Sequence, residues 1–353
     1  MNLKQVIDEL IEEKGIDRTV LGSIVTDAML SAYQKKYPSV LFSARYIDSS
    51  GDLIILAQKT VVSVVRDGLT EISLKKARFI VKDAEIGTVL TLPFEEKIGR
   101  VEILYARQFM AQKIRTIEAD AIYVEFKKKQ GEIVHGHVHK MERSGVTIKL
   151  DDTLAFLPHQ NMIPSDKIIV GMPIKTLLKE VYSEPRGDYQ LILDRVSSDF
   201  LFRLLELEVP EIFERLIEVK KIVRIAGYKS KVIVVSRDKN IDAVGTCVGV
   251  GGSRILPILS ELGTEKIDII PWTESIEDLV KNALKPAKVS RVEFVGKDLA
   301  RVWVDEDQRS YAIGKSGQNI ALASRLVGFS IQIAQKNNDD SSSHQSDNDN
   351  SLW

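Results

Sequence analysis

Two short glycine motifs constrain the fold of this chain more than any other feature. The first, GVGG, covers residues 249–252, and the second, GKSG, covers residues 314–317. In each case an apolar stretch runs into G-x-x-G, and the pattern of a helix and then a strand follows. The first glycines, Gly249 and Gly314, lie 65 residues apart. That spacing is long enough for a small repeated domain.

A nucleotide phosphate loop is the simplest alternative, but the spacing excludes it. A Walker loop needs G-x-x-x-x-G-K-[ST], and Arg309 stands where its first glycine should be. The fingerprint G-x-G-x-x-G fits Gly249 and Gly251, but Arg254 occupies the third glycine position. A single G-x-x-G is most often only a turn before a helix. Glycines ahead of a helix N-terminus also suit a sugar-phosphate backbone, so the context of the motif has to decide.

Both motifs lie in the same predicted order of elements. The hydrophobic patterns from residue 199 predict α-β-β-α-α-β, and the order repeats from residue 275. In both copies the G-x-x-G loop falls between two helices. KH domains use such a loop to clamp about four nucleotides through their backbone. The repeat therefore predicts two tandem prokaryotic-type KH domains, at 199–273 and 274–336.

The rest of the chain predicts two further domains and a tail. Residues 1–130 read as an α+β domain, with expected helices at 3–11, after Asp17, at 71–80 and at 105–127, and strands at 40–47, 53–57 and 60–65. Residues 131–198 hold about five short strands separated by turns, which is typical of a small OB-fold β-barrel. Residues 337–353 are polar and acidic, and we expect them to be disordered. The predicted fold class is multidomain α+β.

Composition and charge limit the classes of function. The net charge is −1, so any nucleic-acid binding must come from local patches. A single cysteine, Cys247, excludes intrachain disulfides and multi-cysteine zinc sites. No apolar run reaches about 18 residues, and the N-terminus lacks the apolar core of a signal peptide. We therefore expect a cytoplasmic protein with no membrane partner.

The loops and their flanks supply the predicted RNA contacts. Hydroxyl and ammonium groups in the loops offer donors to phosphates, and the next polar residues extend this edge into each following helix. Arg195, at the end of the barrel segment, joins the set. The predicted RNA-binding residues are Gly249, Val250, Gly251, Gly252, Ser253, Arg254, Gly314, Lys315, Ser316, Gly317, Gln318, Asn319 and Arg195. The first KH unit also carries the basic residues Lys220, Lys221, Arg224, Lys229, Lys231 and Arg237.

Three histidines raise the question of a metal site. His135, His137 and His139 alternate along one predicted strand and therefore share a face. No cysteine or close carboxylate completes a zinc set, so we expect no metal. The chain also lacks H-E-x-x-H, G-x-S-x-G and kinase signatures. We expect no catalytic residues, no cofactor and no enzymatic activity.

Several longer segments resemble the NusA family of bacterial transcription factors. They are IYVEFKKKQGEIVHGHV, FLPHQNMIPSDKI, LELEVPEIFERLIEVKKIVRIAGYKSKVIVVS, GTCVGVGGSRI, ELGTEKIDIIPW and YAIGKSGQNIALASRLVGFSIQI. The resemblance implies a barrel of the ribosomal S-one type and an N-terminal domain that binds RNA polymerase near its RNA exit channel. It implies that the barrel and KH pair hold nascent single-stranded RNA, and that other antitermination factors are further partners. The implied function is a transcription elongation factor that modulates pausing, hairpin-dependent termination and antitermination.

Two other functions stay open at this point. One is an RNA-processing enzyme, because polynucleotide phosphorylases also combine KH and OB modules, although in the reverse order and behind large catalytic domains. The other is a ribosome-associated RNA-binding protein. A phosphate-dependent RNA degradation assay distinguishes the enzyme from a transcription factor. Co-purification with polymerase rather than ribosomes distinguishes a transcription factor from the ribosome-associated protein.

Overall fold

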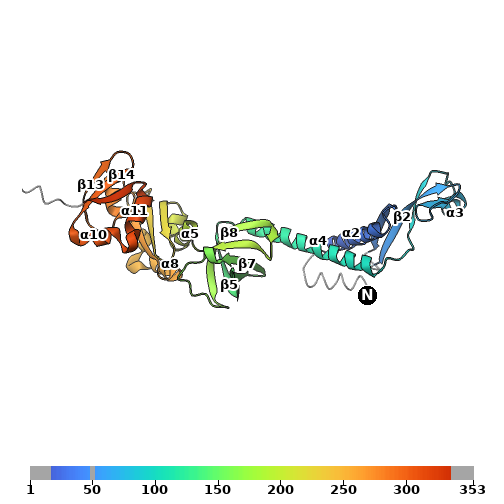
Figure 1. Ribbon diagram of the computed structural model, residues 1–353, viewed down its shortest axis with the longest axis horizontal. Helices are drawn as coiled ribbons and strands as arrows, with labels where there is room; N and C mark the ends of the chain where they lie inside the picture. The colour runs from blue at the N-terminus through green and yellow to red at the C-terminus, as the bar shows by residue number, and fades with distance from the viewer. Residues whose placement is uncertain (1–16, 48–51, 335–353) are drawn as a thin grey trace, which may run out of the picture. The chain divides into compact units, whose positions relative to one another are not determined.

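The computed structural model describes residues 17–47 and 52–334. The chain divides into two compact units, Met1–Ile122 and Tyr123–Trp353, and the division falls inside a long helix (Figure 1). The helix predicted at 3–11 and the acidic tail predicted at 337–353 lie outside the described residues.

The described part of the first unit packs three helices and a small sheet. Helix α2 (Arg18–Lys36) begins at Asp17, whose carboxylate accepts a hydrogen bond from the Thr19 N–H. Its apolar face, Leu21, Ile24 and Val25, packs on α4 (Arg100–Lys127). The sheet has the order β1-β2-β3, and β4 also pairs with β2. These elements are β1 (Phe42–Ile47), β2 (Asp52–Val62), β3 (Glu71–Ser73), α3 (Leu74–Ile80) and β4 (Val89–Pro93).

Three boundaries in this unit differ from the sequence prediction. The separate strand expected at 60–65 is wrong, because β2 continues unbroken from residue 52 to Val62. Residues 71–73 form strand β3, and the helix expected there begins only at Leu74. Helix α4 begins at Arg100, five residues before its predicted start.

The second unit begins with a closed five-stranded barrel. Its strands are β5 (Ile133–Met141), β6 (Gly145–Leu150), β7 (Thr153–Pro158), β8 (Pro173–Arg186) and β9 (Tyr189–Asp194), in the order β5-β6-β7-β9-β8. The 3-10 turn η1 (His159–Asn161) follows β7. Alternate side chains such as Ile148 and Leu191 fill the interior. The predicted barrel is present, and its assignment to the OB type stays a prediction.

Two α-β-β-α-α-β units follow the barrel, which confirms the predicted tandem KH order. The first contains α5 (Ser198–Glu208), α6 (Pro210–Phe213), β10 (Ile217–Ile225), β11 (Lys229–Ser236), α7 (Ala243–Val248), η2 (Val250–Gly252), α8 (Ile255–Leu262) and β12 (Lys266–Pro271). The second contains α9 (Ile276–Ala283), β13 (Val289–Val295), β14 (Leu299–Val304), α10 (Glu306–Ile313), η3 (Lys315–Gly317), α11 (Gln318–Val327) and β15 (Ser330–Ala334). In each, the middle strand pairs antiparallel with the first and parallel with the last.

The sheet of the first KH unit is covered on both faces. On one face Val232 packs against its own helices, with Phe200 and Cys247. On the other face Ile233 and its neighbours share a core with side chains of the second unit, including Leu322 of α11. The two KH units therefore form one packed body (Figure 1).

Within the described ranges, no single helix is long and apolar enough to cross a membrane. Only the pair Ala243–Gly252 and Ile255–Leu262 passes that test, when the two pieces are joined across a bend of 79°. These segments flank the first G-x-x-G loop, and several of their apolar side chains lie in the core of the first KH unit.

Candidate nucleic-acid interface

The two G-x-x-G loops adopt closely matching backbone conformations. The φ angle at the first position is 76° in Gly249 and 72° in Gly314. At the third position φ is 61° in Gly251 and 53° in Ser316, and at the last glycine it is 81° and 73°. Glycine adopts such positive φ angles at little cost. The two loops therefore share one backbone conformation, and this accounts for the equal spacing of their first and last glycines.

The first glycine of each loop lies against the start of the following helix. A Cβ atom on Gly314 would stand 2.6 Å from the Cβ of Asn319, and one on Gly249 would stand 2.7 Å from the Ser253 Oγ. A Cβ at Gly251 or Gly317 would meet no atom within 4 Å. Each loop is therefore tightly packed at its first position and open at its outer side.

The outer side of each loop presents backbone N–H groups. Among the described hydrogen bonds, none uses the N–H of Val250 or Gly251 in the first loop, or of Lys315 or Ser316 in the second. The last glycine of each loop instead closes the turn, with N–H to carbonyl distances of 3.1 and 3.2 Å. Successive free N–H groups in a turn ahead of a helix form an anion-binding concavity. Each loop can therefore hold a phosphate.

The loops differ in charge. Lys315 is exposed in the second loop, and the same position in the first is Val250, which is 95% exposed. Arg254 adds little free charge to the first loop, because its guanidinium pairs with Glu211 at 2.7 Å and donates to the Thr246 carbonyl. Burial alone would raise the pKa of Glu211, but its backbone hydrogen bond and Arg254 outweigh this and lower it.

Asn319 faces the interior. Its side chain is 3% exposed, and its Nδ2 donates to three backbone carbonyls at the ends of α9 and α10, at 3.1–3.2 Å. Its Oδ1 accepts from Lys229 of the first KH unit at 3.5 Å. Gln318 is half-buried, and its Oε1 has no partner among the described atoms. The predicted polar edge therefore turns inward directly after the second loop.

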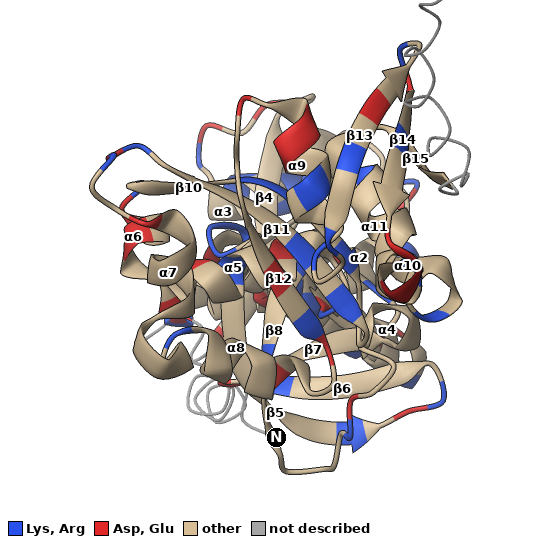
Figure 2. Ribbon diagram, turned by 90° about the vertical axis from the view of Figure 1, so that its left-hand side faces the viewer, with Lys and Arg blue, Asp and Glu red and all other residues tan. Residues whose placement is uncertain are grey.

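The basic residues of the first KH unit divide between surface and interior. Lys220, Lys221 and Arg237 are exposed. Arg224 is buried, and its guanidinium pairs with the buried carboxylate of Glu265 at 2.8 Å. Figure 2 shows charges of both signs along the KH strands β11, β12 and β13. In the described part of the chain, the KH surface therefore carries separate basic residues rather than a broad basic face.

Two lysines of β11 join the KH units through one carboxylate. The Nζ of Lys231 lies 2.8 Å from Asp268 Oδ2 and donates to the Lys285 carbonyl of the second unit at 3.3 Å. The Nζ of Lys229 lies 2.7 Å from the same oxygen. Burial lowers the pKa of Lys231, and Asp268 opposes that shift. The network runs on through Lys229 to Asn319, directly behind the second loop.

Arg195 lies buried where the barrel meets the first KH unit. It is 3% exposed, and its guanidinium pairs with Asp166 at 2.8 Å and Glu261 at 2.6 Å. Burial alone would lower the pKa of Arg195, but the two carboxylates outweigh it and raise that pKa. The guanidinium thus holds the junction together. Its partners lie 29 and 66 residues away in the chain, so no local pattern reveals them.

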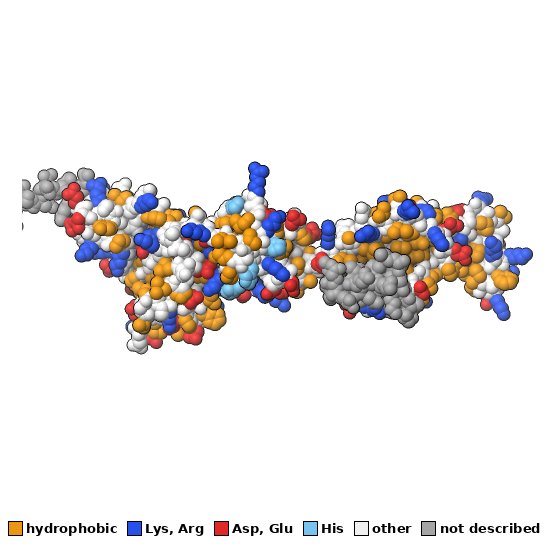
Figure 3. All heavy atoms as spheres, turned by 90° about the horizontal axis from the view of Figure 1, so that it is seen from below, with side chains coloured by type: hydrophobic (Ala, Val, Ile, Leu, Met, Phe, Trp, Pro, Cys, Tyr) orange, Lys and Arg blue, Asp and Glu red, His pale blue; other side chains and the backbone are white. Residues whose placement is uncertain are grey.

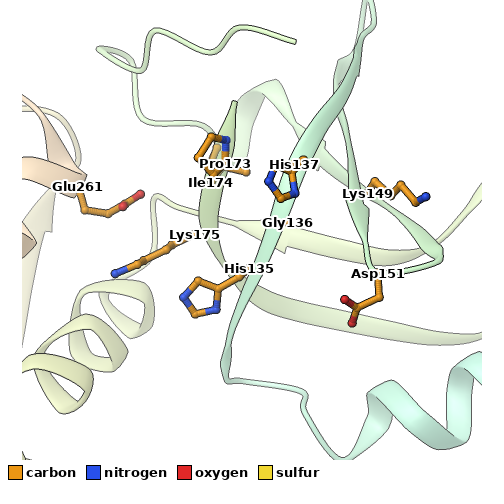
Figure 4. Close-up of a pocket in the computed structure, with 9 residues that line it drawn as sticks. All are labelled: His135, Gly136, His137, Lys149, Asp151, Pro173, Ile174, Lys175 and Glu261. Atoms are coloured by element: carbon orange, nitrogen blue, oxygen red, sulfur yellow. The ribbon is translucent and has the colours of Figure 1, made fainter. Parts of the chain in front are cut away.

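A groove of about 680 Å³ lies between the barrel and helix α8 of the first KH unit. Its lining residues are His135, Gly136, His137, Lys149, Asp151, Pro173, Ile174, Lys175 and Glu261 (Figure 4). No local sequence pattern marks this groove, because its walls come from three strands and a helix. Figure 3 shows the histidines at the surface of the barrel. Among the described residues, no three His, Cys, Asp or Glu side chains gather to hold a metal ion.

The family models and the relatives that match this chain all carry the name of one family. Family models described as the NusA N-terminal domain, the NusA-like first KH domain and the NusA-like second KH domain match residues 2–120, 195–272 and 276–341. The chain is similar to the transcription termination/antitermination protein NusA of Thermus thermophilus, with 37% identity over 82% of this chain and 76% of that protein. It is also similar to the proteins of that name from Rickettsia conorii (34% identity, 94% and 67%) and Bacillus subtilis (34% identity, 92% and 88%). By its domains and by these relatives, the chain belongs to the NusA family.

Proposed function

We propose that this chain is a transcription elongation factor that binds RNA polymerase and nascent single-stranded RNA. It modulates pausing, hairpin-dependent termination and antitermination. The relatives are named as termination/antitermination proteins, which supports this reading. The structural observation that carries it is the pair of G-x-x-G loops with matching backbone geometry in one packed body.

The proposed RNA contacts are the exposed parts of the two loops. Val250 and Gly251 in the first loop, and Lys315 and Ser316 in the second, offer N–H groups to phosphates, with Ser253 beside them. Such a clamp reads the backbone and makes little demand on base sequence. The guanidinium of Arg195 is buried in the junction between the barrel and the first KH unit. In this proposal Arg195 therefore stabilises that junction and does not contact RNA.

We propose that the N-terminal domain and the rest of the chain bind different partners, as the sequence predicts. Residues 1–130 bind RNA polymerase, and the match to the NusA N-terminal domain supports this. The barrel at 131–198 and the KH domains at 199–273 and 274–336 bind RNA, because both G-x-x-G loops lie there. The chain acts in the cytoplasm, without chemistry on the RNA, and other antitermination factors are further partners.

The test uses the full chain and a loop variant, Gly251→Asp with Lys315→Asp. Unmodified chain should co-purify with RNA polymerase and bind single-stranded RNA. The variant should keep polymerase and lose most RNA affinity, because both phosphate sites gain a negative charge. Co-purification with ribosomes alone, or phosphate-dependent RNA degradation, would replace the proposal by one of the two rival functions. Unchanged RNA affinity of the folded variant would remove the loops from the proposal.

A further inference from the structure

We propose that the groove between the barrel and α8 binds one unpaired nucleobase of the RNA, stacked between His135 and His137. The adjacent phosphates lie on Lys149 and Lys175. This inference rests on the proposed function, since the base belongs to the strand that the KH loops hold.

The two histidines are placed to sandwich a flat ring. Both are exposed on β5, and they share a face because one residue separates them. The residue between them, Gly136, is buried and faces the barrel interior, where a Cβ would lie 2.6 Å from the Lys149 carbonyl oxygen. Residues two apart on a strand are about 6.8 Å apart. This is twice the roughly 3.4 Å rise of stacked bases, and histidine is among the side chains that stack on RNA bases.

The flanking strands place one lysine on each side of this pair. Lys175 of β8 lies opposite His135, and Lys149 of β6 lies opposite His137. Directly opposite residues of an antiparallel pair point to the same face. Figure 4 shows the two lysines on opposite sides of the imidazoles. A strand whose base enters between the rings therefore meets a cation before and after it.

The carboxylates of the groove leave these cations available. Glu261 already pairs with Arg195 at 2.6 Å. Lys175 has one long contact, 3.9 Å to Glu208. Asp151 stands at the turn after β6 and is the one further acid of the lining. By formal charge the lining is balanced, with two lysines against two carboxylates, and one of these carboxylates, Glu261, is already paired with Arg195.

Arg195 makes the groove a preformed site. Its guanidinium bonds the Lys175 carbonyl on the barrel side and Glu261 on the KH side, so both walls are fixed. Helix α8 links the groove to the first loop, because it begins at Ile255 just after that loop and carries Glu261 near its end. Eight helical residues span about 12 Å. A strand clamped at the loop reaches the groove within a few nucleotides.

The test uses the full chain and a ten-nucleotide single-stranded RNA with 2-aminopurine at successive positions. One position should lose fluorescence on binding, because stacking quenches that base. His135→Ala with His137→Ala should abolish that quenching and weaken binding about tenfold. Replacing both histidines by Phe keeps two stacking rings and should retain affinity. His139→Ala is the matched control, since His139 is exposed on the same strand but does not line the groove.

The lysines have their own measurement. Lys149→Gln with Lys175→Gln should lower the slope of log affinity against log salt by about 1.4, because each phosphate contact on a single strand contributes about 0.7. The inference is overturned if the alanine pair binds like the unmodified chain, if the Phe pair binds as weakly as the alanine pair, or if His139→Ala loses as much. If the loop variant loses RNA binding and the alanine pair binds normally, the groove proposal is overturned and the proposed function stands. Absence of RNA binding by the unmodified chain would sink the proposed function itself.

Discussion

Gly251 and Ser316 occupy the same left-handed backbone position in two loops that lie 65 residues apart in the chain, with φ angles of 61° and 53°. An L-residue with a side chain pays about 1–2 kcal/mol to adopt this conformation, and glycine pays almost nothing. The second loop therefore carries a strain that the first avoids.

Exchanging these residue types should move stability in opposite directions. Ser316→Gly should raise the free energy of unfolding by about 0.5–1 kcal/mol, because the relief of strain exceeds the extra chain entropy of glycine. Gly251→Ser should lower it by about 1–2 kcal/mol. Urea unfolding followed by fluorescence measures both. Changes of the same sign would show that the backbone shape is not the cause.

Asp at the second loop position should affect RNA binding unequally in the two loops. Lys315→Asp removes a cation and adds a negative charge, whereas Val250→Asp only adds the charge. The first change should cost on the order of 1 kcal/mol more in binding and lower the salt slope by about one more. Affinity across a salt series measures both values. Equal losses would mean that the Lys315 ammonium does not meet a phosphate.

Arg195→Ala should destabilise the second unit. It leaves the carboxylates of Asp166 and Glu261 without their buried cation, which should cost about 3 kcal/mol. Arg237→Ala is the control, because that exposed arginine lies 3.9 Å from Glu218 and should cost less than about 1 kcal/mol. Denaturant unfolding gives the cost. Equal costs for the two variants would show that the Arg195 guanidinium does not hold the junction together.

Cys247 should make stability fall in alkaline solution. Burial raises the pKa of this thiol from an ordinary value of 9.0 to about 11. The unfolded chain therefore releases the thiol proton near pH 9, and the folded chain keeps it until about pH 11. The stabilising contribution is complete below pH 9 and is lost as the pH rises towards 11, by on the order of 2 kcal/mol.

The measurement compares unfolding of the unmodified chain and Cys247→Ala at several pH values between 8 and 11. Lysines and tyrosines titrate in both proteins, so the difference between the two curves isolates the thiol. Curves that stay parallel over this range would show that Cys247 keeps its ordinary pKa in the folded state.

The sequence predicts the elements of the KH units well because helix and strand periods alternate clearly there. It misplaces the end of β2, because Gln58 and Lys59 look like a break between two apolar runs, although polar residues also fit an exposed strand position. The start of α4 is missed for a related reason. Val101 and Leu104 are exposed, so no buried stripe marks the first turn of that helix.

The candidate site shows the same limit at the level of single residues. Arg195 and Asn319 are polar and stand next to a turn or loop, which favours a surface role in any local pattern. Their burial is decided by distant partners, such as Glu261 for Arg195 and Lys229 for Asn319. Backbone shape is easier to foresee, because the glycines of G-x-x-G mark the first and last positions of positive φ, although nothing in the motif marks the third position, where the second loop has Ser316.

The core that the two KH units share has a consequence for biosynthesis. The first unit completes its own strands at Pro271, but α11, which covers the outer face of their sheet, ends only at Val327. At about 5–20 residues per second, the ribosome leaves this face open for several seconds. During that time Lys231 is hydrated and charged beside Ile233, and a charge on an apolar strand face opposes aggregation. The lysine that the finished protein buries thus protects the unfinished one.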